Sequence, residues 1–551
     1  MTGTGADARE RALGSLLDAV VADRCQAWLD GRTDSDDPAW DGGLWVLALA
    51  LAMRWEEAIG VAEALADVSP ADRDAWWLGR AATLWARSGD PRPGSATALD
   101  ELQETSLPDP VAPLGRFAGH LIVEATMAHA RLDLAADAIE RMGPGLWEPL
   151  HLAGRRHPFA TVAAVCRARV LAFRGDIAAA DAVLATIVPP EEPTLQALLA
   201  GTSALVRGND ADAADVRRFV ADVDRMQTPE GHLAVGSQML AAFGEIALFD
   251  MTSAARRVLV AGGDEDLSRL NVIDRALALE MLIAFAVAES DLDAAEAWAD
   301  RLLPLVSSPI ADSTAARALS RVALLAGRAD EAVVWAERAV ARARQVDRVI
   351  EYTEGEIVLN RARLEHSGSS GGAAARALSE MVTEAEQRGH GMARRAAARE
   401  LRVAGLRLPP LAGSGWAGLS EREAEVARMV TSGASNREVA AALHISDHTV
   451  RAHVSRTLAA FGVATRSGLP AAMHQAPDPP GDTRPALTPR QREVVALVAA
   501  GLPNDEVAAR LGLSHRTVER HVSDVLVRWS LPNRTALART WVSQAGSPGS
   551  G

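Results

Sequence analysis

Apolar residues recur three and four positions apart through most of the first 400 residues, and the alternation expected of strands is scarce. This spacing puts apolar side chains on one stripe of a helix, so it predicts helices almost throughout. Five segments share a short polar or glycine corner followed by an alanine-rich helix. They begin at Arg54, Arg131, Arg174, Glu289 and Ala326.

The corners return at a regular interval. Aligning Ala58, Ala136, Ala179, Ala295 and Ala332 gives separations of 78, 43, 116 and 37 residues. These are near one, two or three multiples of about 40, a period typical of stacked helix pairs that bury their faces only against neighbours. The pattern resembles a degenerate tetratricopeptide-like superhelix. We therefore predict an all-α chain with a helical-repeat solenoid over residues 1–365, the alternative being a non-repeating helical bundle.

Breaks in the pattern mark the domain boundaries. Residues 366–418 contain a Ser/Gly patch and a turn-rich stretch, so we expect a terminal helix with flexible linkers there. Residues 470–486 hold five prolines and should form a stiffened spacer, helical at most over the opening residues. The segments 419–469 and 487–544 remain as two small domains.

These two segments match each other at a constant offset of 68 residues. The first reads LSEREAEVARMVTSGASNREVAAALHISDHTVRAHVSRTLAAFGVATRSGL and the second LTPRQREVVALVAAGLPNDEVAARLGLSHRTVERHVSDVLVRWSLPNRTAL. The spacing predicts three helices in each copy, the third protruding as in a helix-turn-helix. The residues that would cap or stop these helices are the pairs Ser420–Glu423 and Thr488–Gln491, the glycines Gly433 and Gly501, and the serines Ser446 and Ser514.

The third helix carries an apolar stripe in both copies. Its residues are Val450, Val454, Leu458 and Phe461 in the first copy and Val518, Val522, Leu526 and Trp529 in the second. A helix that buries this stripe leaves its other face for a partner, and its size suits a major groove.

Both segments resemble the DNA-binding domain of the LuxR/GerE family of bacterial transcription regulators. The shared pattern is L-[ST]-x-R, then G-x-x-N-x-E-V-A-x-x-L, then S-x-x-T-V-x-x-H-V, then a terminal arginine, Arg466 or Arg534. The resemblance covers about a fifth of the chain. It implies a four-helix domain whose third helix reads DNA and whose last helix often mediates dimerisation.

The resemblance also implies the DNA-contacting residues. In the first domain these are Asn436, His448, Thr449, Arg451, Ser455 and Arg456, and in the second Asn504, His515, Arg516, Thr517, Arg520 and Arg528. Arginine can bind guanine bidentately or pair with phosphate, and hydroxyls suit either role. The asparagines open the second helix, where backbone N–H groups can hold a phosphate.

The second copy departs from the family pattern. Glu519 stands where the first copy has Arg451, and Pro503 and Asp505 replace Ser435 and Arg437. A carboxylate facing phosphate is repulsive, so we expect the second domain to bind DNA weakly or differently, the alternative being a purely dimerising or structural role. The 17-residue spacer reaches at most about 55–60 Å, so one chain could occupy half-sites about 34 Å apart.

Composition narrows the function classes. All 57 basic residues are arginine, which excludes an ordinary P-loop and Schiff-base chemistry, and two cysteines among 551 residues exclude a disulfide scaffold. The net charge is −15, yet residues 413–551 hold 15 arginines against 12 acidic residues, an asymmetry that suggests an anionic partner for the tail. No apolar run approaches a membrane span or a signal peptide, so we expect a cytoplasmic protein without membrane contact.

No enzyme constellation, cofactor motif or metal-ligand set stands out. GSGWAG at 413–418 follows no strand, and His151 with His157 lacks a third ligand. Thirteen tryptophans accompany one tyrosine, eight of them between Trp28 and Trp147, which indicates packing between helix pairs or an aromatic lining for an effector.

We therefore expect a sequence-specific DNA-binding transcription regulator whose repeat region senses a small-molecule or protein effector. The expected partners are double-stranded DNA, RNA polymerase and a second copy of the chain. The alternative is a protein-interaction scaffold whose helix-turn-helix domains serve assembly. Outward arginines would favour DNA, and outward apolar faces would favour protein.

Overall fold

The computed structural model describes residues 3–541 with short gaps. The gaps are 32–37, 67–72, 93–98, 100–101, 103–105, 153, 210–212, 226–230, 249, 368–371, 388–389, 404–418, 420, 444, 462, 464, 476–488, 500–501, 512, 530–533, 535–536 and 538–540. The chain divides into two compact units, Met1–Pro409 and Pro410–Gly551, which we call the body and the tail.

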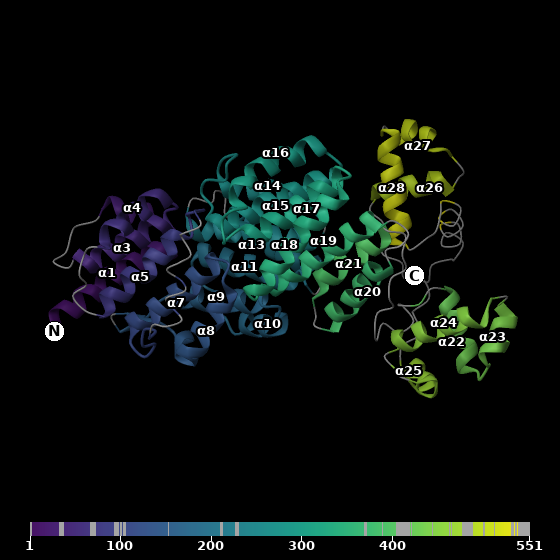
Figure 1. The fold of residues 1–551 in the computed structure, drawn as a ribbon, viewed down its shortest axis with the longest axis horizontal. Helices are drawn as coiled ribbons and strands as arrows, with labels where there is room; N and C mark the ends of the chain where they lie inside the picture. The colour runs from purple at the N-terminus through teal and green to yellow at the C-terminus, as the bar shows by residue number, and fades with distance from the viewer. Residues whose placement is uncertain are drawn as a thin grey trace, which may run out of the picture. The chain divides into compact units, whose positions relative to one another are not determined.

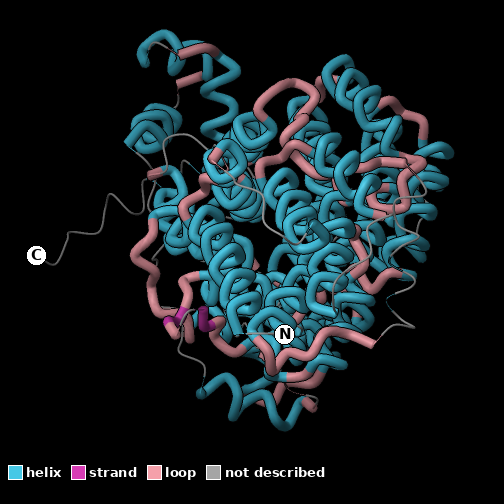
Figure 2. Tube along the Cα trace, turned by 90° about the vertical axis from the view of Figure 1, so that its left-hand side faces the viewer, coloured by secondary structure: helices cyan, strands magenta, loops and turns pink. Residues whose placement is uncertain are grey.

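Helices make up almost all of the described chain, which confirms the all-α prediction (Figure 2). In the described residues the only strands are β1 (His151–Leu152) and β2 (Arg155–Arg156), a short antiparallel pair. The helices of the body are α1 (Gly3–Val21), α2 (Cys25–Asp30), α3 (Pro38–Leu51), α4 (Trp55–Leu65), α5 (Arg73–Arg87), α7 (Pro113–Ala128), α8 (Leu132–Met142), η2 (Pro144–Trp147), α9 (Phe159–Phe173), α10 (Ile177–Ala185), α11 (Pro193–Arg207), α12 (Ala213–Asp224), α13 (His232–Ala247), α14 (Met251–Gly262), α15 (Val272–Glu289), α16 (Leu292–Leu302), η3 (Leu303–Leu305), α17 (Asp312–Leu325), α18 (Ala329–Gln345), α19 (Val349–Ser367), α20 (Gly372–Gln387) and α21 (Gly391–Val403).

The body is a stack of antiparallel helix pairs, as the repeat period predicts (Figure 1). Odd-numbered helices pack on one another in sequence, with α3 on α5, α9 on α11, α11 on α13, α15 on α17 and α17 on α19. Each even-numbered helix from α4 to α20 bridges the two odd-numbered helices that flank it in the chain. This two-layer arrangement is that of a helical-repeat solenoid, in which each pair is buried by its neighbours.

The body extends further than the sequence predicts. Helices α20 and α21 lie beyond the expected boundary at residue 365, yet they pack on α19 and belong to the compact unit that ends at Pro409. They bury Leu378, Val382 and Leu401 against Ile357. The Ser/Gly patch that suggested a linker separates two packed helices, because loop composition does not show whether the following helix is buried.

The even-numbered helices share one buried position. In six of them the fourth residue after the N-cap is an alanine with 0% exposure, namely Ala58, Ala135, Ala180, Ala254, Ala295 and Ala332. The alignment made from sequence chose Ala136 and Ala179 and was wrong there by one residue. One residue rotates a helix face by about 100°, and in alanine-rich segments the sequence does not mark which alanine faces inward.

The turn before these helices also repeats. Met53, Ala130, Gly175, Ser290 and Gly327 each have φ between 59° and 85°, one residue before the N-cap of the next helix. The N-cap N–H then donates to the carbonyl five residues earlier, as in Asp291 to Ala286 and Arg328 to Ala323. This is the geometry of a Schellman-type helix stop, and it reverses the chain within three residues.

The superhelix closes upon itself. The Trp55 Nε1–H donates to the carbonyl of Arg269 over 3.1 Å, and the Val272 N–H donates to the carbonyl of Ser88 over 3.0 Å. His390 Nε2 hydrogen-bonds the carbonyl of Gly175, and α7 contacts α15. Repeats far apart in sequence therefore meet around the interior of the body.

The tryptophans pack between helices, as one of the two interpretations predicts. Trp40, Trp55, Trp77 and Trp85 are all at most 6% exposed and belong to the main core. Trp85 also lines the cavity inside the body, the one described tryptophan to do so, and the aromatic-lining interpretation stays a prediction. No described helix is long and apolar enough to cross a membrane.

The turns allow a paired test of backbone strain. Gly327 has φ of 73° and open space around an added Cβ, so Gly327→Ala should destabilise the body by about 1 kcal/mol through backbone strain alone. Ser290 is exposed with φ of 59°, so Ser290→Gly should stabilise the body by up to about 1 kcal/mol. Urea unfolding followed by tryptophan emission checks both variants, and midpoint shifts of the same sign would contradict this account.

Candidate nucleic-acid interface

Each half of the tail has three described helices around a small apolar core, and in the first half a fourth helix also packs on it. The first half has α22 (Glu421–Thr431), α23 (Asn436–Leu443) and α24 (Asp447–Ala460), followed by η6 (Arg466–Gly468) and α25 (Leu469–Gln475). The second has α26 (Pro489–Ala499), α27 (Asn504–Leu511) and α28 (His515–Arg528). The predicted stripe of the third helix forms the core, with Val450 and Val518 fully buried and Phe461 and Trp529 at most 8% exposed.

The third helix of each half is capped as the sequence predicts. The Thr449 N–H donates to Ser446 Oγ over 3.0 Å, and the Thr517 N–H donates to Ser514 Oγ over 3.1 Å. The hydroxyls of each serine and threonine also hydrogen-bond one another at 2.7 Å. Both threonines, predicted as DNA contacts, therefore take part in the cap.

One capping box escaped the sequence analysis. At the start of α23 the Ser435 N–H donates to Glu438 Oε2 over 2.7 Å, and the Glu438 N–H donates to Ser435 Oγ over 3.3 Å. The Ser435 N–H and hydroxyl both donate to the Glu438 carboxylate and hold its pKa below the ordinary value. The signal was the S-x-x-E spacing, and Pro503 removes the hydroxyl in the second copy.

Gly433 stops α22 with φ of 98°, as predicted. The other predicted caps and stops at Ser420, Thr488 and Gly501 lie outside the described residues.

The terminal arginine of each copy hydrogen-bonds the start of its second helix, an interaction that we call the arginine latch. Arg466 Nη1 donates to Asn436 Oδ1 over 2.9 Å, and Nη2 donates to the carbonyl of Ala434. In the second copy Arg534 donates to Asn504 Oδ1 and to the carbonyl of Leu502 in the same way. The structure thus joins two parts of the sequence pattern that lie 30 residues apart. The oxygen atoms of both asparagine side chains are engaged within the protein.

The predicted contacts of the first domain fall into two groups. Arg451 and Ser455 are exposed one turn apart on α24, whereas Arg456 is half-buried. Arg456 Nε lies 2.5 Å from Glu423 Oε1, and its Nη2 hydrogen-bonds His453 Nδ1 at 2.7 Å. The backbone of His448 lies in α24, and its side chain is outside the described residues.

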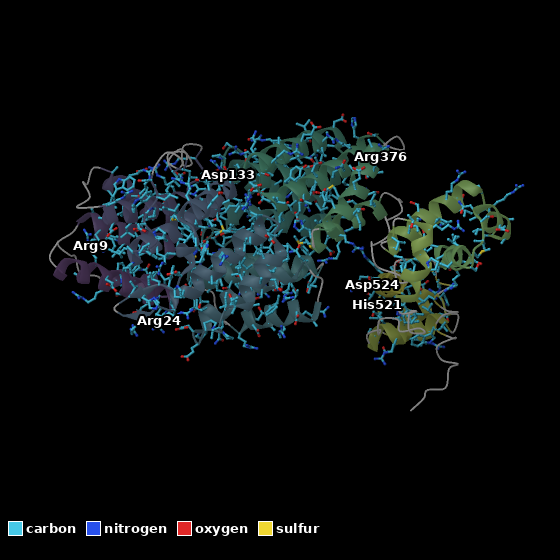
Figure 3. The ribbon with its side chains drawn as sticks, turned by 90° about the horizontal axis from the view of Figure 1, so that it is seen from below. Arg9, Arg24, Asp133, Arg376, His521 and Asp524 are labelled. Atoms are coloured by element: carbon cyan, nitrogen blue, oxygen red, sulfur yellow. The ribbon has the colours of Figure 1, made fainter. Side chains whose placement is uncertain are left out.

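The second domain presents a different face. His515, Arg516 and Arg520 are exposed on α28, and no ion pair holds either arginine among the described residues. Asp524 is exposed on the same helix, near His521 (Figure 3). The side chain of Arg528 is not among those described.

The two third helices differ at equivalent positions. At the offset of 68 residues, Arg451 corresponds to Glu519 and Arg456 to Asp524. The ion pair of Glu423 with Arg456 has no counterpart in the second copy, where Gln491 and Asp524 stand at those positions. Two faces with different donors and acceptors cannot read the same base pattern equally well.

No large apolar side chain is exposed on these outward faces among the described residues. The exposed large hydrophobic residues of the described chain, from Trp45 to Val334, all belong to the body. The described side chains on the outer faces of α24 and α28 are polar or charged, which suits phosphate and base edges rather than an apolar protein surface.

Comparison with known proteins agrees with this geometry. Residues 417–471 and 485–541 match the family model described as bacterial regulatory proteins, luxR family. Both tail segments are therefore LuxR-family helix-turn-helix domains, and the class of domain predicted from the sequence is confirmed.

The curated relatives described next each match only a short part of the chain. The chain is 43% identical over 63 residues to a putative HTH-type transcriptional regulator of Mycobacterium tuberculosis, covering 11% of this chain and 7% of the relative. It is 43% identical over 58 residues to the nitrate/nitrite response regulator protein NarL of Escherichia coli, covering 10% of this chain and 26% of NarL. The two-component response regulator PprB of Pseudomonas aeruginosa is 43% identical over 65 residues, covering 12% of this chain and 24% of PprB. The chain thus spans about a quarter or less of the length of these relatives.

Among solved structures, a Rap protein complexed with competence and sporulation factor aligns with a TM-score of 0.35 and 12% identity. The alignment covers 67% of this chain and 97% of that one.

The arginine latch can be tested within the full chain. Arg466→Ala leaves the carbonyl of Ala434 and the side chain of Asn436 without their charged donor, which should destabilise the first domain by about 2–3 kcal/mol. Hydrogen–deuterium exchange should then speed up in α22–α24 and stay unchanged in α26–α28. Unchanged protection in the first domain would show that the latch contributes little.

Proposed function

We propose that the chain is a sequence-specific DNA-binding transcription regulator of the LuxR type. The observation that carries this proposal is the exposed arginine-bearing face of α24 and α28, each held on a helix-turn-helix core. In this arrangement the third helix enters the major groove, where Arg451, Arg516 and Arg520 reach base edges or phosphates. The other residues predicted to contact DNA lie on the same two helices or, for Asn436 and Asn504, at the start of α23 and α27.

The body is proposed as the sensing part of the regulator, with a small-molecule or protein effector. Its other partners are a second copy of the chain and RNA polymerase, and its place of action is the cytoplasm, where the DNA is found. No enzymatic activity is proposed. The scaffold alternative is less well supported, because the described outer faces of α24 and α28 are polar or charged.

Selection of duplexes from a random library with the purified full-length chain tests the proposal. Enrichment of a defined site would support DNA reading, and a two-part site would indicate that both domains engage. Binding that never exceeds the non-specific level at any salt concentration would contradict it.

Arg451→Ala separates base reading from charge. If Arg451 contacts a base, affinity for the selected site should fall by about 1–3 kcal/mol, whereas non-specific binding should change little. Arg428 is exposed on α22, outside the third helix. Arg428→Ala therefore removes an equal charge away from the proposed reading face and is the matched control. Fluorescence anisotropy with selected and scrambled duplexes measures both, and equal losses for the two variants would contradict a role for Arg451 in base reading.

The spacer between the domains sets which sites one chain can span. Helix α25 takes up residues 469–475, so shortening should fall within 476–486. Six remaining residues reach about 20 Å, less than the roughly 34 Å between successive half-sites. Affinity for two-part sites should then drop at least about tenfold, towards that of one half-site. A Gly/Ser replacement of equal length should keep the affinity, and unchanged binding by the shortened chain would exclude simultaneous occupation.

A further inference from the structure

The odd-numbered helices of the body surround a cavity of about 710 Å³. Its lining comes from α1 through α21 and therefore from nearly every repeat. The cavity is partly open to solvent, so a ligand from solution can reach it. It falls within the range of small-molecule sites, about 300–1,000 Å³.

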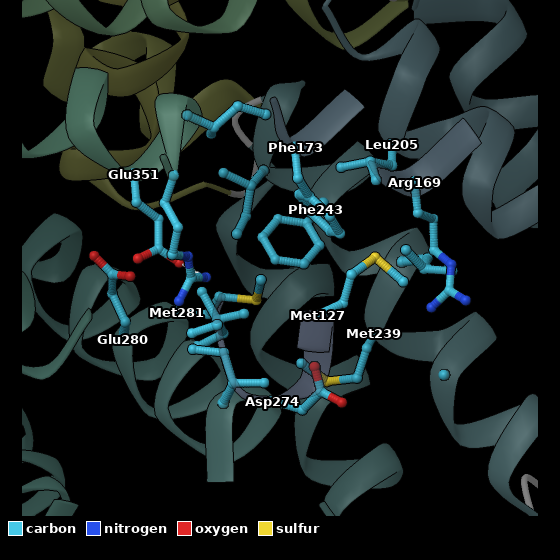
Figure 4. A pocket seen from close by; sticks show the side chains of 18 of the residues that line it. Met127, Arg169, Phe173, Leu205, Met239, Phe243, Asp274, Glu280, Met281 and Glu351 are labelled. Carbon is cyan, nitrogen blue, oxygen red and sulfur yellow. Dashed lines mark ion pairs between the residues drawn. The ribbon is translucent and has the colours of Figure 1, made fainter. Parts of the chain in front are cut away.

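The centre of the cavity is apolar (Figure 4). Three methionines and two phenylalanines, together with a leucine, project into it from five helices: Met127, Phe173, Leu205, Met239, Phe243 and Met281. Methionine side chains are flexible and polarisable, so they adapt to ligands of varied shape. Water has few hydrogen-bond partners in such a centre, which favours an apolar occupant.

Paired charges lie on two sides of this centre. On one side Arg317, 2% exposed, donates to Glu280 from Nε over 2.6 Å and from Nη2 over 2.5 Å, and Arg348 pairs with Glu351. On the other side Arg169 pairs with Glu124. These arginines and carboxylates largely neutralise one another, so they offer little net charge to a ligand.

Asp274 differs from these groups. No ion pair joins its carboxyl to any described residue, and its backbone N–H donates to Asn271 Oδ1 at the N-cap of α15 over 2.9 Å. Burial is the main cause that raises its pKa to about 6, and Glu124 acts in the same direction, whereas Arg169, a hydrogen bond with the Asn271 side chain and Arg348 oppose the rise. The carboxyl is therefore ionised near neutral pH beside an apolar cavity, with the charges of Arg169 and Arg348 acting on it but no described arginine paired with it (Figure 4).

We propose that this cavity binds a small amphipathic amine, with its apolar part among Met127, Met239 and Phe243 and its ammonium group paired with Asp274. The inference rests on the proposed sensing role of the body and names the class of its effector. An ammonium would pair directly with the Asp274 carboxylate, which no described arginine does, and the apolar body fills space that packing leaves open.

Three probes of one shape test the charge preference. They are 4-phenylbutylamine, 4-phenylbutan-1-ol and 4-phenylbutanoate, titrated into the full chain by calorimetry at pH 7.5. The amine should bind saturably and about tenfold or more tightly than the alcohol, with the carboxylate weakest. Equal affinities, or preference for the carboxylate, would overturn the proposal.

Asp274→Asn should abolish the preference for the amine. Because the raised pKa means that the ionised carboxyl is disfavoured in the folded chain above pH 6, this variant should be at least as stable as the parent at pH 7.5. If the Asp274 side chain serves only to stabilise the first turn of α15, amine affinity will stay unchanged in the variant, and this would contradict the proposed pairing.

The pH dependence of amine binding gives an independent test. Lowering the pH from 7.5 to 5 protonates most of Asp274 and should weaken amine binding about tenfold in the parent but not in Asp274→Asn. His120 and His232, which also line the cavity, have pKa values lowered to about 4 by burial, so both stay neutral over most of this range. A parent chain whose amine affinity does not change with pH would contradict the pairing.

Gly236 provides a steric test with a matched control. It lies on α13 at the cavity, and a Cβ added there meets no atom within 4 Å. Gly236→Phe should place a ring in the cavity and weaken all three probes, whereas Gly236→Ala should leave binding unchanged. Retained affinity in Gly236→Phe would place the probes elsewhere. None of these titrations involves DNA, so their failure and a failure of DNA binding are distinguishable.

Discussion

The repeat body depends on close approach of neighbouring helices at the alanine that follows each N-cap by four residues. At Ala58, Ala135, Ala254 and their equivalents only a buried methyl group separates the even-numbered helix from the odd-numbered helices. A larger residue would push the layers apart, because a packed interior does not absorb even one methylene without cost. A left-handed residue before five of these helices reverses the chain and sets the rotation that brings this alanine inward.

The interior of the superhelix buries charged side chains. Closing the stack brings α7, α9, α15, α17 and α19 together, and their charged residues form buried pairs such as Arg317 with Glu280. Such pairs contribute little net stability, but removal of one partner leaves an uncompensated charge. They hold the inner helices in one arrangement around a cavity whose centre is apolar. The proposed sensing by the body and the proposed DNA reading by the tail fall to units with separate cores.

The tail uses one scaffold twice with different outward chemistry. Both copies make the same hydrogen bonds at the cap, from Ser446 or Ser514, and at the arginine latch, from Arg466 or Arg534. Both copies therefore position the third helix alike. The exposed residues diverge, with Arg451 replaced by Glu519 in the second copy. The two copies thus share the supporting contacts but present dissimilar outward faces on their third helices.

Local signals in the sequence determined the helices, the repeat period, the caps of α24 and α28 and the doubled LuxR-family domain, because each depends on residues a few positions apart. The sequence left open which alanine of a run faces inward, whether α20 and α21 pack, and that Asn436 is engaged by Arg466. Those features depend on contacts between residues distant in the chain, as does the cavity beside Asp274. Tertiary structure alone decided them, since the burial of a side chain is a property of the neighbours that the fold brings to it.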